Sequence, residues 1–168
     1  VSVALSENWA LIGAHTARKA FLYKKNQVST WETNSAFIFN PSTDNEFFGR
    51  NVALTDTWAL IGAYGDNKAY MYQNINSTFW NTTPAFIFDQ NTEDAYFGYS
   101  VALTAEWAVI GAANLKKAFV FRVNGYNSWS TTATTVLERV GGNGDARFGY
   151  YIAVTDIWTL VGAYDDNT

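Results

Sequence analysis

Residues 97–112 read FGYSVALTAEWAVIGA, and the same pattern returns as FGRNVALTDTWALIGA at 48–63 and as FGYYIAVTDIWTLVGA at 148–163. A further copy, without its Phe-Gly pair, opens the chain at Val1. The 168 residues are therefore an internal repeat with a period of about 50 residues. Such a period is typical of propeller blades and other repeat arrays.

The tryptophans follow the same period. They form two sets of equivalent positions, spaced 49, 49 and 51 residues apart in the first and 49 and 49 in the second: Trp9, Trp58, Trp107 and Trp158; and Trp31, Trp80 and Trp129. Recurrence at strand starts predicts that both sets pack as wedges between adjacent sheets. The competing interpretation is an exposed platform for sugars, and it is stronger for the Trp80 set, which is expected nearer the outer edge.

The second copy shows the strands that each repeat predicts. They are expected at 51–55, 58–63, 68–72 and 85–88, separated by turns and polar loops. The run 58–63 is apolar throughout, as in a strand that is buried on both faces. The glycine of each Phe-Gly pair is expected to permit a positive φ or a close backbone approach: Phe48-Gly49, Phe97-Gly98 and Phe148-Gly149.

The predicted fold is all-β, a propeller-type array of four-stranded blades. Its repeats are expected at 1–47, 48–96 and 97–147, with a partial repeat at 148–168. A closed propeller needs about four to eight blades, so we expect a segment of a longer protein or a subunit that completes its fold with neighbours. A chain that ends after two strands of a blade leaves an open sheet edge, which invites pairing with another chain. The 168-residue chain is therefore not expected to behave as a well-folded monomer.

Composition restricts the partners. A net charge of −4 and a pI near 4.8 argue against nucleic acid, which needs a basic face. The absence of cysteine removes disulfides and thiol chemistry. No stretch approaches the ~20 apolar residues of a membrane span. The sequence thus predicts no nucleic acid partner and no membrane span in this segment.

The stretches FGYSVALT at 97–104, WAVIGA at 107–112 and VGAYDD at 161–166 resemble the FG-GAP repeat, in the variety that reads FGxSVA…VGAY. The resemblance implies a β-propeller like that of the integrin α head, on extracellular or surface proteins that act in adhesion and recognition. The chain departs from the family's repeat pattern in two respects. The family's calcium loop is replaced by turns of two or three residues, which offer too few oxygens for calcium. The proline of GAP is replaced by His15, Tyr64, Ala113 and Tyr164.

Few residues are candidates for catalysis or metal binding. His15 is the only histidine, so a zinc site and a Ser–His relay both lack parts. Acidic pairs such as Asp44 with Glu46 lie in predicted linkers and are interpreted as solvated. The sequence predicts no catalytic residue, no metal and no cofactor.

The loops after the second strands are the predicted ligand-binding face. Tyrosine with Asn and Asp is typical of recognition surfaces, and equally of turns. The candidates are Tyr64, Asp66, Asn67, Asn114, Tyr164 and Asp165. Two sequons, at Asn76 and Asn81, are candidates for glycosylation, although composition alone predicts that number.

The leading functional hypothesis is a non-enzymatic extracellular or surface interaction or structural protein. It would present its loops to a protein or glycan partner, or self-assemble with further copies or blades. The alternative is a carbohydrate-binding, lectin-like propeller, although the loops at 15–18, 64–67 and 113–116 differ in sequence. An enzyme whose catalytic residues lie in blades outside this chain also stays open.

Overall fold

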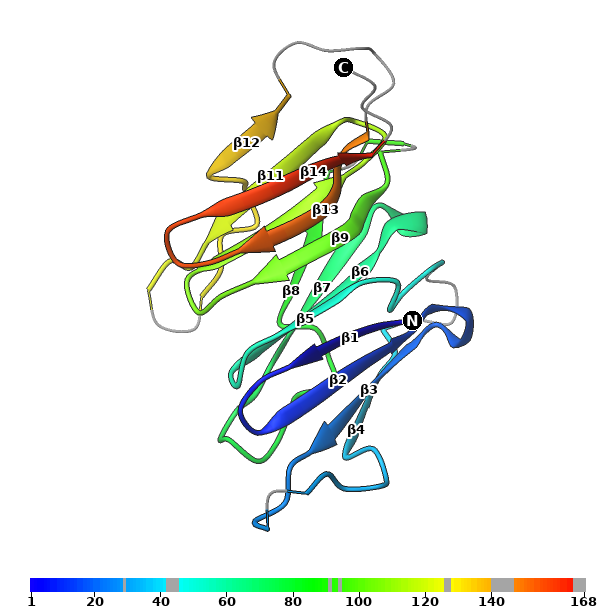
Figure 1. Ribbon diagram of the computed structural model, residues 1–168, viewed down its shortest axis with the longest axis vertical. Coiled ribbons are helices and arrows are strands. Elements are labelled where there is room, and N and C mark those ends of the chain that lie inside the picture. Colours follow the sequence, from blue (N-terminus) through cyan, green and yellow to red (C-terminus); the bar gives the residue numbers. More distant parts are fainter. Residues whose placement is uncertain are drawn as a thin grey trace.

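The computed structural model describes residues 1–28, 30–41, 46–90, 92–93, 95–125, 128–139 and 147–164. The described residues form four antiparallel sheets in chain order (Figure 1). Sheet 1 contains β1 (Ser2–Leu5), β2 (Trp9–Ala14), β3 (Lys19–Lys24) and β4 (Phe37–Phe39). Sheet 2 contains β5 (Val52–Leu54), β6 (Trp58–Ala63), β7 (Lys68–Gln73) and β8 (Phe86–Asp89). Sheet 3 contains β9 (Phe97–Leu103), β10 (Trp107–Ala112), β11 (Lys117–Arg122) and β12 (Thr135–Glu138), and sheet 4 contains β13 (Arg147–Val154) and β14 (Thr159–Tyr164).

Each four-stranded sheet is a meander in which consecutive strands pair. Short 3-10 turns, η1 (His15–Ala17) and η2 (Tyr64–Asp66), follow the second strands of sheets 1 and 2. The predicted all-β, propeller-type array of four-stranded blades is confirmed. Among the described residues, the sheet in the last copy has two strands.

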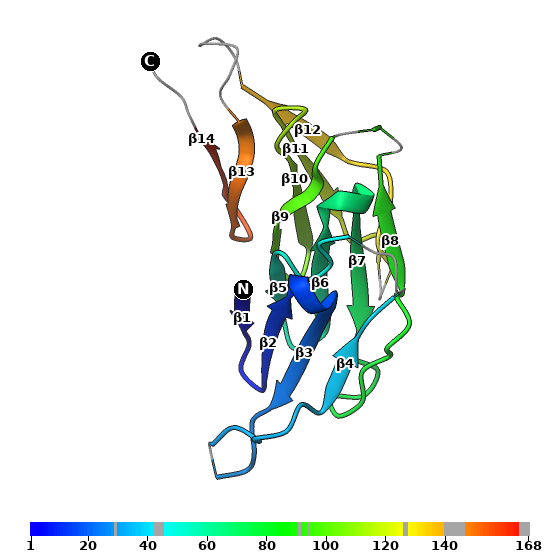
Figure 2. The same cartoon turned by 90° about the vertical axis from the view of Figure 1, so that its right-hand side faces the viewer.

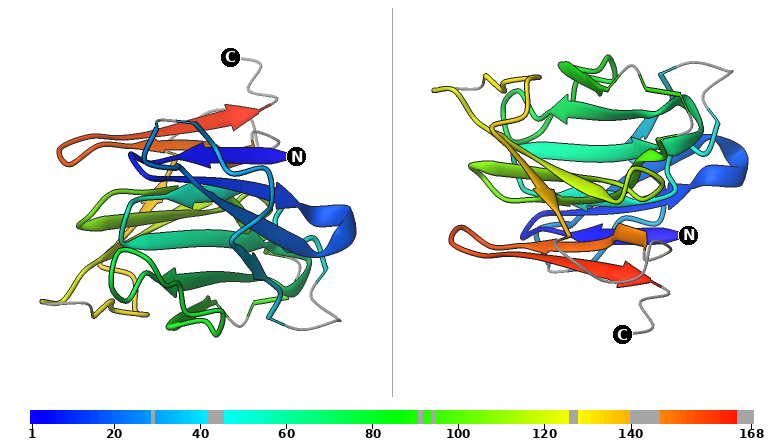
Figure 3. Two further views of the ribbon diagram at one scale, coloured as in Figure 1. Left: turned by 90° about the horizontal axis from the view of Figure 1, so that it is seen from below. Right: turned by 90° about the horizontal axis from the view of Figure 1, so that it is seen from above.

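The sheets are stacked face to face, with their first strands on one side of the molecule and the fourth strands β4, β8 and β12 on the other (Figure 2). The first strands contact one another in order, β1 with β5, β5 with β9 and β9 with β13. Views along the long axis show β1 and β13 on the same side (Figure 3). Contact along the first strands with divergence at the fourth is the geometry of neighbouring propeller blades.

An apolar core lies between each pair of neighbouring sheets, and the core between sheets 3 and 4 has the fewest buried residues. The core between sheets 1 and 2 joins side chains such as Leu11 and Phe39 to Ile61 and Tyr72. The next core joins Leu60, Met71 and Phe88 of sheet 2 to partners on sheet 3. Strand β6 contributes to both cores and is buried at every position. This explains its continuous apolar run and confirms the prediction made from it.

A pair of glycines sets the distance between neighbouring sheets. Gly98, in the Phe-Gly pair, has a φ of +86°, in the left-handed region that favours glycine. Its carbonyl oxygen would lie 2.0 Å from a Cβ at Gly62. Gly13 with Gly49 and Gly111 with Gly149 repeat the approach at 2.1 Å. Both predicted roles of the Phe-Gly glycine, positive φ and close backbone approach, are confirmed.

The two tryptophan sets contact each other across the sheets. Trp9 packs edge-on against Trp80, with ring centroids 5.8 Å apart and planes at 82°. Trp58 packs against Trp129 in the same way, at 6.0 Å and 89°. Trp80 and Trp129 are buried, so the interpretation of these two as an exposed sugar platform is wrong. Each pair links the second strand of one sheet to the third-to-fourth-strand loop of the next.

The wedge prediction is wrong for Trp31 and Trp158, which are exposed, and it holds only in part for the half-buried Trp107. Trp31 lies on the outward face of sheet 1 and Trp158 on that of sheet 4. Within the described part of the chain, no further sheet packs on either face. A tryptophan at either of these repeat positions is therefore buried only where a neighbouring sheet covers it. The sequence of one repeat does not show whether such a sheet is present.

Tyr72 carries a buried hydroxyl for which the described residues offer no hydrogen-bond partner. Burial raises the pKa of Tyr72 far above its usual value near 10. The folded state therefore favours the neutral phenol, and the associated stability is complete below about pH 10 and is lost as the pH rises above it.

We predict that Tyr72→Phe raises the free energy of unfolding by about 1 kcal/mol at pH 7, because it removes an unpaired buried hydroxyl. The variant should also lose less stability above about pH 10. Denaturant titrations at pH 7 and pH 10.5 (about half a unit above the reference pKa) would measure both effects. Tyr23→Phe, at the same repeat position on the half-buried outward face of sheet 1, is the control. A destabilised Tyr72→Phe variant would contradict the prediction.

Candidate functional site

Aromatic rings form a continuous row across the end of the array where the second strands finish. This aromatic ladder comprises Phe47, Tyr64, Tyr96, Tyr99, Tyr150 and Tyr164, together with Arg50. Its successive ring centroids are 4.5 Å apart for Phe47–Tyr64, 5.0 Å for Tyr64–Tyr99, 4.5 Å for Tyr99–Tyr150 and 5.0 Å for Tyr150–Tyr164. Tyr96 joins at 5.2 Å from Tyr64. The ladder thus runs from the link after sheet 1 to the end of β14.

Arg50 provides the charge at the centre of the ladder. Its guanidinium carbon lies 5.4 Å from the centroid of the Tyr99 ring, within cation–π range. Its Nη2 donates to the Tyr99 hydroxyl at 3.4 Å. Arg50 is half-buried beside the rings.

Two ladder residues have an unusual backbone. Phe47 has a φ of +59° and Tyr96 a φ of +53°, and both directly precede a Phe-Gly pair. A bulky side chain in this region costs of order 1–3 kcal/mol. The chain adopts the same strained conformation at two equivalent links, and at both it places an aromatic ring in the ladder. Strain that recurs in this way is typical of functional sites.

Ionisation in the ladder is shifted towards neutral side chains. Burial raises the pKa of Tyr64, partly offset by the charge of Arg50. A hydrogen bond with Tyr99, and then burial, raises the pKa of Tyr150. Beyond Phe47, burial lowers the pKa of His15, with the N-terminal amino group and Arg50 acting in the same direction. Near neutral pH the hydroxyls of Tyr64 and Tyr150 are therefore uncharged.

Some residues of the predicted ligand-binding face belong to the aromatic ladder, and others have a structural role. Tyr64 and Tyr164 both belong to the ladder. Asp66 and Asn67 instead hold the links between sheets: Asp66 Oδ1 accepts from the backbone N–H of Glu46 at 3.1 Å, and Asn67 Oδ1 accepts from that of Phe97 at 3.3 Å. Burial raises the pKa of Asp66, against the opposing effect of the Glu46 N–H.

The remaining candidates lie away from the ladder rings or outside the described residues. Asn114 is exposed in the turn between β10 and β11. Asp165 lies outside the described residues. Both sequon asparagines are exposed in the β7–β8 loop. There, Asn76 Oδ1 accepts from the hydroxyl and the backbone N–H of Thr78, at 2.8 and 3.3 Å.

Sequence reasoning missed most of the ladder: Phe47, Arg50, Tyr96, Tyr99 and Tyr150. A signal was present, because an aromatic residue or arginine stands directly before the phenylalanine and directly after the glycine of each Phe-Gly pair. Those flanking positions had no predicted role. Only the folded array shows that they meet the loops after the second strands.

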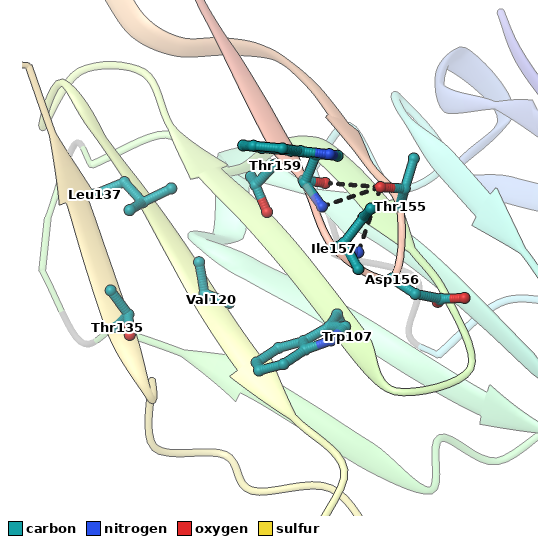
Figure 4. Close-up of a pocket in the computed structure, with 9 residues that line it drawn as sticks. Trp107, Val120, Thr135, Leu137, Thr155, Asp156, Ile157 and Thr159 are labelled. Carbon is teal, nitrogen blue, oxygen red and sulfur yellow. Dashed lines mark hydrogen bonds between the residues drawn. The ribbon is translucent and has the colours of Figure 1, made fainter.

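A second candidate is a groove of about 320 Å³ between sheets 3 and 4 (Figure 4). Trp107, Val120 and Leu137 line one side, and the turn at residues 155–159 lines the other. At the two inner interfaces, aromatic side chains from the third strand of the following sheet pack there with a loop tryptophan: Tyr72 with Trp80, and Phe121 with Trp129. The groove is therefore the position of interblade packing, and its lining offers no reactive group beyond Asp156 and threonines.

The described residues contain no group of three or more His, Asp or Glu placed to hold a metal ion. In the same part of the chain, no helix is long and apolar enough to cross a membrane. Arg50 with the tyrosine hydroxyls is instead suited to hydrogen bonding and stacking.

The fold and this surface define a propeller-type array of blades with an aromatic face. No protein family's sequence profile matches the chain, and no curated protein sequence matches it. The chain is similar in structure to a protein from Lactobacillus plantarum whose crystal structure was determined as a structural genomics target, with a TM-score of 0.61 at 8% identity. The match covers 84% of this chain and 42% of that protein's chain. At this identity the similarity shows the fold alone.

Proposed function

We propose that the chain is a non-enzymatic interaction module built of FG-GAP-like blades, extracellular or on a cell surface. Its aromatic ladder binds a protein or glycan partner. The observation that carries the proposal is the recurrence of strained aromatic residues, Phe47 and Tyr96, in one row with the half-buried Arg50.

The composition of the ladder supports binding rather than catalysis. Tyrosine and arginine are among the residues enriched at the energetic centres of interfaces. Tyrosine supplies a large contact area with little side-chain entropy to lose. Most ladder rings touch a neighbour, so the surface is already ordered before a partner arrives, which lowers the entropic cost of binding.

The ladder favours a protein partner over a sugar. Tyr64 and Tyr99 are tilted by 53° and Tyr99 and Tyr150 by 44°, so these rings do not form a flat platform. A lectin-like role is the second candidate, supported by the row of tyrosine hydroxyls along the ladder. It predicts saturable binding to defined glycans.

We predict that the double variant Phe47→Gly/Tyr96→Gly folds but loses partner binding at least tenfold, equivalent to about 1.4 kcal/mol. Glycine accepts the positive φ at both sites, so the rings are removed without adding backbone strain. Wild type and variant would be immobilised in parallel and exposed to surface extract from the source organism. The same proteins would be tested on a glycan array.

Ser77→Gly is the matched control, since Ser77 also has a positive φ, of 65°, but lies in the β7–β8 loop. Binding that is lost only in the double variant supports the ladder. Glycan binding that is lost in this way supports the lectin-like role. Identical capture by all three proteins would contradict the proposal.

A further inference from the structure

We propose that the two outward faces at the ends of the array bind each other, joining copies of this chain head to tail. In this contact Trp158 of one copy packs against Trp31 of the next. The inference rests on the packing of the blades and is independent of the proposed role of the ladder.

The outward face of sheet 4 exposes an unusual amount of apolar surface. Trp158 is 74% exposed and Leu160 72%. The equivalent residues in sheet 2, Trp58 and Leu60, are 3% and 0% exposed because sheet 3 covers them. Side chains alternate along a strand, and Val161 packs towards sheet 3. Leu160 therefore faces away from the array, and Trp158, directly before β14 at the rim of the groove between sheets 3 and 4, is largely exposed to solvent.

The outward face of sheet 1 is the opposite half of the same kind of contact. Val3 is 66% exposed, Leu5 68% and Trp31 41%. Their equivalents in sheet 2 are 5%, 8% and 0% exposed, buried against sheet 1: Val52, Leu54 and Trp80. Each chain thus carries one uncovered face of each type.

The inner interfaces show how two such faces fit. In both, the tryptophan that starts a second strand meets the loop tryptophan of the next sheet edge-on, at 5.8 and 6.0 Å. In repeat register, Trp158 corresponds to the first partner and Trp31 to the second. The contact that covers each face within the chain therefore shows how a second copy can cover the same face.

A polar contact has matching residues as well. Between sheets 1 and 2, Asp56 Oδ1 accepts from the Ser6 hydroxyl at 2.6 Å and from the Asn8 backbone N–H at 3.2 Å. At the ends of the array, the position of Asp56 is held by Glu7 and that of Ser6 by Thr155. Glu7 of one copy can thus accept from Thr155 of its neighbour.

The end contact lacks one hydrogen bond that the inner interfaces have. Ser2 and Asn51 accept from the backbone N–H of Val52 and Val101 in the following sheets, at 3.2 and 3.0 Å. Their equivalent in sheet 4 is Tyr151, which is exposed. That hydrogen bond is replaced by additional apolar surface.

Two complementary faces on one chain produce a heterologous contact, which closes into a ring or continues as a filament. Two copies that use both contacts would bring together eight sheets, four from each chain. This is within the range of about four to eight blades in closed propellers. The expected closed species has a mass of about 37 kDa, twice the chain mass of 18.7 kDa.

Light scattering on the 168-residue chain over a range of concentrations tests the proposal. The wild type is expected to associate, to about 37 kDa for the ring or to higher multiples of 18.7 kDa for a filament. Trp158→Ser and Trp31→Ser should each be monomeric at the same concentrations. Both side chains are exposed in the single chain, so both variants should keep the sheet content of the wild type, as checked by circular dichroism.

Mixing the two variants gives the decisive result. Each retains the face that the other lacks, so an equimolar mixture rebuilds one native contact and should give a pair of about 37 kDa. Ile87→Ser is the control, because Ile87 is 47% exposed on β8, away from both end faces; it should keep the wild-type mass. A monomeric wild type, association that survives Trp158→Ser, or a mixture that stays monomeric would each overturn the proposal.

Discussion

Replacing Gly62 by alanine is expected to lower the free energy of unfolding by about 3 kcal/mol, near the upper end of what overpacking in a core typically costs. The added Cβ would lie 2.0 Å from the Gly98 carbonyl oxygen, and two backbones would have to separate to accommodate it. Strand β6 is buried on both faces, so the displacement affects both apolar cores. Denaturant unfolding followed by tryptophan fluorescence would measure the loss.

Gly162→Ala is the control, at the same repeat position in β14. There the nearest atom to an added Cβ is the Tyr151 Cβ at 3.4 Å, an ordinary contact. Its free energy of unfolding should stay within about 0.5 kcal/mol of the wild type. Equal effects at Gly62 and Gly162 would mean that the glycines do not set the distance between sheets.

Trp80→Ala is expected to cost about 4 kcal/mol of unfolding free energy, as large truncations in cores do. The Trp80 side chain is buried between sheets 1 and 2. Its ring lies against Trp9 at 5.8 Å and Phe39 at 6.1 Å. The same unfolding titration measures the effect, which is a large share of the roughly 5–15 kcal/mol that stabilises a typical domain.

Trp31→Ala is the matched control, because Trp31 occupies the same repeat position but lies on an uncovered face. At concentrations where the chain is monomeric, its cost should be within about 0.5 kcal/mol. A large loss for Trp31, or a small one for Trp80, would contradict the assignment of buried and exposed tryptophans.

The strands were predictable because each repeat carries its own signals. The apolar run of β6, the Phe-Gly pair and the Gly-Ala pair are local properties. The apolar run and Gly-Ala recur in four copies and Phe-Gly in three, and this recurrence removed the ambiguity of a single short run. The close contact between Gly62 and Gly98 was predicted for its Phe-Gly member, Gly98. Only glycine suits both a positive φ and a backbone contact at this distance.

The burial of the tryptophans was predictable only in part. Trp80 and Trp31 share one sequence context, but the first is covered by a neighbouring sheet and the second is not. The aromatic ladder could not be predicted for a similar reason. Arg50 and Tyr99 follow Phe-Gly pairs in different repeats, 49 residues apart, and they touch only because sheet packing brings successive links together. Contacts between repeats depend on the angle and spacing of sheets, which no single repeat specifies.

A double-mutant cycle on Trp9 and Trp80 tests most directly whether equivalent residues pack the blades against one another. The free energies of unfolding of Trp9→Leu, Trp80→Leu and the double variant would be compared with that of the wild type. An edge-on pair predicts a coupling of about 1 kcal/mol beyond the sum of the single effects. Strictly additive losses would show that the two rings do not touch and would contradict the face-to-face packing of sheets 1 and 2.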